Sequence, residues 1–214
     1  MAEIVLCKIC GKRRARRACP AVSGDICNMC CGTEREVSLS CPIRCPFLQE
    51  AHRREKPVSA EPTAPSYPEI EVTEERLAAN EELLMFCIYT LVEASLRTPG
   101  AIDSDLVAAL ESLIETHRTL ESGLVYETRS RNALAAEIQR IFTRSLEDYT
   151  KRRQSDDPLR PVRNSDVLAI LVFLHRFGQL NQNGRPRGRM FIDLLRHMAP
   201  DEVRVPEQPS SIII

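Results

Sequence analysis

Eight cysteines between Cys7 and Cys45 constrain this 214-residue chain more than any other feature of its sequence. Disulfide bonds would require an oxidising compartment, and the segment from Met1 to Cys10 lacks the basic start and long apolar stretch of a secretory signal. We therefore expect a cytoplasmic protein in which the clustered thiols bind metal. The ninth cysteine, Cys87, lies in an apolar segment and is expected to be a small core residue.

The spacing of the clustered cysteines matches tetrahedral zinc coordination. Two of the pairs have the two-residue gap that lets a tight turn supply neighbouring corners of a tetrahedron, and Gly11 and Gly32 follow these pairs closely. An iron–sulfur cluster is the alternative, but the sequence lacks a ferredoxin-type run. The expected metal ligands are Cys7, Cys10, Cys19, Cys27, Cys30, Cys31, Cys41 and Cys45.

The adjacent Cys30 and Cys31 indicate two zinc ions per chain. Neighbouring side chains point in different directions, so both cannot readily bind the same ion. We predict an interleaved, cross-brace arrangement, although Cys30 and Cys31 could be exchanged between the two sites. His52 could replace a cysteine, but with eight thiols available we expect an ordinary surface histidine. The first predicted ligand set is Cys7, Cys10, Cys27 and Cys30, and the second is Cys19, Cys31, Cys41 and Cys45.

This alternation of cysteine pairs resembles the small two-zinc fingers of the HIT, MYND and B-box families. The resemblance covers about 50 N-terminal residues and rests on cysteine spacing. The chain departs from these families in having no histidine within the series and a long gap between Cys31 and Cys41. The resemblance implies a cross-brace fold that mediates contacts with other proteins. No family is recognised for residues 73–214.

Composition and proline placement divide the chain into four segments. With 43% apolar and 28% charged residues, the chain can bury a core, and composition excludes a disordered protein. We expect a zinc-finger module at 1–55, a proline-rich linker at 56–72, an all-α domain at 73–205 and a tail at 206–214. The predicted fold is mainly α, with four or five helices in the second domain. The linker should leave few contacts between the two modules.

Apolar residues three and four positions apart predict the helices of the second domain. We expect helices at about 74–97, 103–126, 132–153, 166–177 and 190–197, with Thr73 as the first N-cap. In the cysteine-rich module, Thr33 to Glu36 has a capping-box sequence that predicts a short helix after the second cysteine pair. Another helix should begin at Pro46 and run to about Arg54.

Two basic runs have two interpretations each, although the whole chain is nearly neutral, with 29 basic and 30 acidic side chains. The runs could bind the phosphates of DNA or RNA. Alternatively, the first run could balance the negative charge of the zinc–thiolate sites, and the second could form a solvated turn. The candidate phosphate-binding residues are Lys12, Arg13, Arg14, Arg16, Arg17, Arg185, Arg187 and Arg189.

The sequence contains no motif of an enzyme. An all-cysteine zinc site is closed to substrate, and the chain lacks a P-loop, a dinucleotide-binding glycine motif and a serine elbow. No run of apolar residues is long enough for a membrane span, and nothing indicates a small-molecule substrate. We expect a non-catalytic adaptor or regulator whose partner is another protein. The alternatives are a DNA- or RNA-binding regulator and a thiol-based redox sensor.

The last three residues, Ile212 to Ile214, form an apolar end to the predicted tail. We expect them to dock on the chain's own helical domain or, alternatively, in a groove of a partner.

Overall fold

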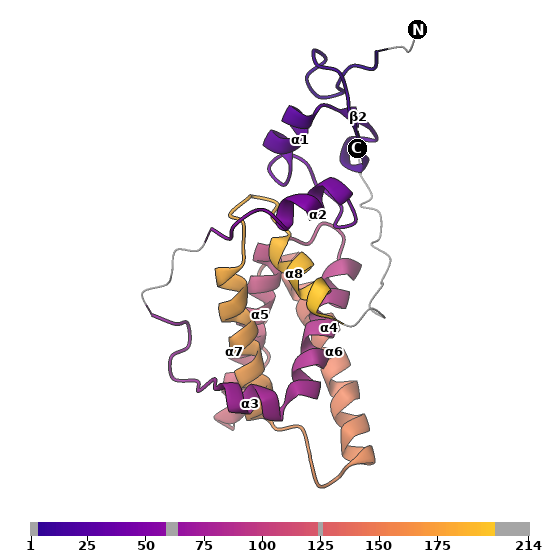
Figure 1. The fold of residues 1–214 in the computed structure, drawn as a ribbon. Helices are drawn as coiled ribbons and strands as arrows, with labels where there is room; N and C mark the ends of the chain where they lie inside the picture. The colour runs from indigo at the N-terminus through magenta and orange to yellow at the C-terminus, as the bar shows by residue number, and fades with distance from the viewer. Residues whose placement is uncertain (1–3, 59–63, 124–125, 200–214) are drawn as a thin grey trace.

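The computed structural model describes residues 4–58, 64–123 and 126–199, and it places a cysteine-rich module at one end of a helical bundle (Figure 1). We use "cysteine-rich module" for residues 4–55 and "helical bundle" for residues 73–199. The predicted tail at 206–214 lies outside the described residues, so its docking stays a prediction. The elements of the module are β1 (Arg17–Cys19), a 3-10 turn η1 (Pro20–Val22), β2 (Gly24–Ile26), α1 (Asn28–Glu34) and α2 (Pro46–His52).

Four long helices lie side by side in the bundle, and two short helices cap its ends (Figure 1). α5 packs against α6 and α7, and α4 packs against α6. α8 contacts both α4 and α2, which places it between the bundle and the module. The bundle helices are α3 (Glu74–Ala79), α4 (Glu81–Arg97), α5 (Asp103–Glu121), α6 (Ala133–Asp156), α7 (Asn164–Leu180) and α8 (Met190–Met198).

The bundle core consists of the apolar stripes that the sequence periodicity predicts. Cys87 is fully buried in this core, as expected. The largest completely buried side chains include Ile88, Leu110, Ile138, Phe142 and Phe191. Burial of each such side chain contributes about 1.5–3 kcal/mol to stability, and these side chains belong to one continuous apolar core.

Several predicted helix boundaries are wrong, including the end of α6, which lies at Asp156 rather than near 153. The helix predicted at 74–97 is interrupted at Asn80, whose side chain bonds back to the carbonyl of Arg76, so α3 and α4 are separate helices. α5 ends at Glu121 rather than near 126, because Gly123 adopts a left-handed conformation with φ 77°. α7 extends to Leu180, three residues beyond the prediction, while Thr73 caps α3 as expected.

The short helix after the second cysteine pair is also different from the prediction. α1 begins at Asn28 and contains Cys30 and Cys31, with Cys27 as its N-cap. Thr33 lies inside this helix and its hydroxyl bonds back to the carbonyl of Met29, so it is not an N-cap. Glu36 lies beyond the helix and has a left-handed backbone conformation with φ 54°. The capping-box prediction failed because the cysteine pair itself starts the helix.

The cysteine-rich module and the bundle are in extensive contact, and the expectation of few contacts is wrong. Ile43 of the module is buried in the apolar core of the bundle. His52 of the module lies between two buried carboxylates: Nε2 donates to Glu36 at 3.1 Å and Nδ1 donates to Asp193 at 3.0 Å. The linker also contacts the bundle, because Arg176 donates to the carbonyls of Ser66 and Tyr67.

His52 is therefore a buried, charged residue, and the prediction of a surface histidine is wrong. Burial alone would lower its pKa, but hydrogen bonds to Asp193 and Glu36 outweigh that effect and raise it to about 9. Because His52 carries a positive charge, it compensates for two carboxylates that could not remain buried and ionised by themselves. The three side chains join one residue of α2, one of the turn after α1 and one of α8.

The described residues include no helix that is long and apolar enough to cross a membrane.

We predict that His52→Ala lowers the free energy of unfolding by about 3–5 kcal/mol, because it removes the positive charge that bonds two buried carboxylates, of which Asp193 keeps its contact with Arg196 at 2.9 Å. The stabilisation by protonated His52 should be complete below about pH 6.5 and lost as the pH rises through about 9. The difference in the free energy of unfolding between the wild type and the variant, measured by thermal and denaturant unfolding, should therefore become smaller above pH 9.

The matched control is Arg53→Ala, because Arg53 is the next residue and its side chain is 70% exposed. This variant should change stability by no more than about 0.5 kcal/mol. Equal losses in the two variants would contradict a specific role for the buried ionic contacts.

Candidate metal centre

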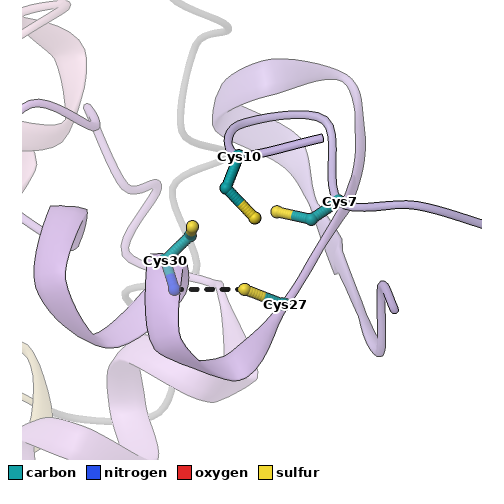
Figure 2. A group of neighbouring side chains, drawn as sticks. All are labelled: Cys7, Cys10, Cys27 and Cys30. Atoms are coloured by element: carbon teal, nitrogen blue, oxygen red, sulfur yellow. Dashed lines mark hydrogen bonds between the residues drawn. The ribbon is translucent and has the colours of Figure 1, made fainter. Parts of the chain in front are cut away.

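Four cysteines from the first turn of the module and from the start of α1 come together. The sulfur atoms of Cys7, Cys10, Cys27 and Cys30 all lie within 4.8 Å of one another, and Figure 2 shows their side chains converging. A zinc ion with Zn–S distances of about 2.3 Å requires sulfur separations of about 3.8 Å, so small rotations of the side chains suffice to bind it. The group fits tetrahedral zinc, and it is the first ligand set predicted from the sequence.

Local backbone structure brings each cysteine pair to this site. Cys7 and Cys10 lie in a tight turn that Gly11 completes with φ 62°, and the Gly11 N–H donates to the carbonyl of Cys7 at 2.8 Å. Cys27 caps α1, and its sulfur accepts from the backbone N–H of Cys30 at 3.4 Å. A turn and a helix start thus each supply two neighbouring corners of the tetrahedron.

Backbone amides prepare the site for thiolates. Burial opposes ionisation of Cys7, but N–H groups of Cys10, Cys27 and Ile9 outweigh it and lower the Cys7 pKa to about 6. The pKa of Cys10 is also lowered, mainly by amides of the following turn. Burial and the neighbouring cysteines raise the pKa of Cys30. A divalent cation would balance the negative charge that the four thiolates bring together.

Arg13 lies against this cluster. The Arg13 side chain hydrogen-bonds with Cys27, and charges on Cys10 and Cys27 help to raise the Arg13 pKa. The contact matches the charge-balancing interpretation of the basic run, at least for this residue.

The other four cysteines surround a separate small pocket. Cys19, Cys31, Cys41 and Cys45 all line it, together with Arg17, Phe47 and Leu48. They are farther apart than the first group, which is the compact cysteine cluster among the residues described. Burial raises the pKa of Cys41 to about 11, and nearby Cys45 and Cys19 add to the shift. The second predicted set is therefore gathered around one pocket without forming a compact tetrahedron.

Arg17 closes one side of this pocket. Its Nη1 donates to Cys31 Sγ at 3.2 Å, and its guanidinium lies 4.6 Å from the centroid of the Phe47 ring. A cation in contact with a sulfur and an aromatic ring is held within the fold. Arg17 thus contacts the second cysteine set, as Arg13 contacts the first.

The remaining basic residues fall into two groups. Lys12, Arg14 and Arg16 are exposed on the first run. The second run contacts the module: Arg185 binds Glu55 at 3.0 Å and the carbonyl of Arg35 at 2.8 Å, and the exposed Arg187 donates to Ser40. The backbone N–H of the buried Arg189 donates to Glu36 at 2.7 Å. The second run therefore forms intramolecular contacts rather than a solvated turn.

Sequence reasoning missed the buried residues that connect the module to the bundle. Glu36 and Asp193 were not singled out, and His52 was assigned to the surface. One signal was available for Asp193, because it lies within the apolar run Met190 to Leu195. A lone carboxylate in such a run is buried only when it finds a partner.

Comparisons with known proteins return no relative: no family model, curated protein or solved structure matches this chain. The likeness to two-zinc fingers thus rests on the cysteine spacing and on the four-cysteine cluster alone.

We predict that Cys10→Ser removes one zinc ion per chain and unfolds the segment around the first cluster, because three thiolates no longer close the tetrahedron. Elemental analysis of the purified protein measures the metal. Cys87→Ala is the matched control, since Cys87 is equally a cysteine but lies in the bundle core. The Cys87→Ala variant should be less stable than the wild type but keep its metal. Equal metal loss in both variants would contradict the assignment of Cys10 as a metal ligand.

We also predict that Arg13→Glu accelerates zinc release at least about tenfold, because it places a carboxylate beside the thiolates. Arg16→Glu makes the same charge change at an exposed position and should leave release unchanged. Release is followed with a chromogenic chelator. The same rate in both variants would show that only net charge matters.

Proposed function

We propose that this protein is a non-catalytic, zinc-binding adaptor whose cysteine-rich module contacts another protein. The observation that carries the proposal is the four-cysteine cluster, whose four thiols fill a tetrahedron and leave no position for a substrate or water. Zinc in a closed site organises a fold and does not perform chemistry. The module would accordingly present a surface rather than an active site.

The proposal includes two zinc ions per chain, bound in a cross-brace arrangement. The first ion would bind at the compact cluster, and the second would bind among the cysteines that line the pocket. Two observations support the second ion: four cysteines face one pocket, and Arg17 already contacts one of their sulfurs. Binding would require the four sulfur atoms to move toward one another around the ion.

A protein partner is supported by exposed apolar side chains on the module. Half of the large apolar side chains that are exposed in the described part of the chain belong to it. Exposed apolar residues that lie near one another are typical of interaction sites. Four of them precede or lie in the turn of the first cluster, so zinc binding would hold their backbone in place. These exposed residues are Ile4, Val5, Leu6, Ile9, Met29 and Val37.

Binding of DNA or RNA is the second candidate, supported by the exposed Lys12, Arg14 and Arg16. Five other basic candidates contact the protein itself, which leaves a small phosphate-binding surface. Single-strand binding also needs stacking aromatic rings, and Phe47 of the module is covered on one side by Arg17.

The test uses the full chain loaded with Zn²⁺. We predict two zinc ions per chain by native mass spectrometry, and one ion would contradict the cross-brace arrangement. Affinity capture with the wild type should then recover a partner protein. The double variant Leu6→Asp and Ile9→Asp should bind the same amount of zinc as the wild type but fail to recover this partner. Leu159→Asp is the control, because Leu159 is exposed in the loop between α6 and α7.

Nucleic-acid binding is measured in the same preparation. The adaptor proposal predicts negligible retention on DNA and RNA at every salt concentration. DNA or RNA binding would be established instead if retention falls steeply with salt and if the triple variant Lys12→Glu, Arg14→Glu and Arg16→Glu abolishes it.

A further inference from the structure

We infer that the second zinc ion acts as a latch that holds the cysteine-rich module on the helical bundle, so that its loss releases loop 181–189 and α8. The inference rests on the proposed function, because it requires an ion among Cys19, Cys31, Cys41 and Cys45. It adds a regulatory role for this ion and assigns none to the ion of the compact cluster.

The ligands of the second site hold the turn that contains Glu36. The Arg35 N–H bonds to the carbonyl of Cys31 at 3.2 Å, and the Cys41 N–H bonds to the carbonyl of Leu39, whose own N–H bonds back to the carbonyl of Glu34 at 3.0 Å. Glu36 lies five residues from each of these cysteines and has φ 54°. A non-glycine residue keeps this conformation only where its surroundings impose it. An ion that ties Cys31 to Cys41 would supply that restraint.

A third ligand positions the other half of the contact. Cys45 is the N-cap of α2, and its carbonyl accepts from the N–H groups of Leu48 and Gln49 at 3.0 Å. His52 is the last residue of this short helix. The position of Cys45 therefore sets the direction of α2 and the point at which His52 meets Glu36.

Glu36 receives hydrogen bonds from both sides of the interface. Its carboxylate accepts from His52 at 3.1 Å, from Asn183 at 2.7 Å and from the Arg189 N–H at 2.7 Å. Its carbonyl also accepts from the N–H of Arg187 at 2.9 Å. Glu36 is completely buried. If the turn changed conformation, these donors would lose their acceptor in a region without water, and the contact would open.

The first site is placed to have a different effect. The N-terminal segment of the module, in the darkest indigo, lies at the end remote from the bundle, and α2 lies between this segment and α8 (Figure 1). The turn that contains Cys7 and Cys10 bonds to the carbonyls of Arg13 and Asp25, outside the turn around Glu36. Loss of the first ion should therefore disturb the remote end of the module and leave the interface closed.

Matched variants of the full chain separate the two ions. Cys41→Ser and Cys7→Ser are loaded with Zn²⁺, counted by native mass spectrometry and compared by hydrogen–deuterium exchange. Each should retain one ion. Exchange in residues 181–198 should rise about tenfold in Cys41→Ser and stay within about twofold of the wild type in Cys7→Ser. Equal protection in the two variants would overturn the latch.

A second measurement avoids the ligands altogether. Coupling between two sites is reciprocal, so weakening the interface should weaken retention of the second ion by the same factor. Asp193→Asn, on the bundle side of His52, should weaken the zinc affinity in one of the two phases of an equilibrium titration with a competing chelator about tenfold and leave the other phase unchanged. Glu147→Gln is the control, because Glu147 is exposed on α6. No change in either phase, or the same change in both, would contradict the inference.

The ion count distinguishes the two proposals. A wild type that binds one ion defeats the two-zinc arrangement and the latch together. Two ions with an unaltered interface in both experiments defeat the latch alone.

Discussion

The buried carboxylate of Glu36 is the interaction on which the arrangement of this protein depends. A carboxylate without access to water is tolerated only when several donors surround it, and those donors come from both halves of the chain. His52 supplies the positive charge, and Asn183 and the Arg189 N–H supply the remaining bonds. Each donor must be in position at once, so the module, the loop before α8 and α8 itself adopt one mutual orientation.

The parts that could be predicted from the sequence are those set by neighbours along the chain. Helix periodicity reports burial against one core, and the start of α8 at Met190 and the cap at Thr73 follow from local rules. The spacing within each cysteine pair is equally local, and the predicted grouping of Cys7, Cys10, Cys27 and Cys30 agrees with the structure. The break at Asn80 and the start of α1 at Asn28 were not predicted, because side chains there form hydrogen bonds with the backbone that compete with the general helical pattern.

The interface could not be predicted because its partners lie far apart in sequence. His52 and Asp193 are 141 residues apart, and no periodicity or motif relates them. The basic runs illustrate the same difficulty, since Arg13 and Arg16 look alike in the sequence and differ only in what lies beside them. Both side chains are exposed, but Arg13 reaches the thiol cluster. Charge composition counts such residues equally, while the fold assigns them different roles.

The backbone of Glu36 has a consequence for how this position can vary. Glycine would relieve the left-handed conformation but would remove the carboxylate that His52, Asn183 and Arg189 require. Asparagine and aspartate tolerate that conformation better, yet their shorter side chains end one carbon nearer the backbone. The demands of the main chain and the side chain therefore oppose each other at one residue. No single substitution improves both, so this turn is expected to resist engineering for higher stability.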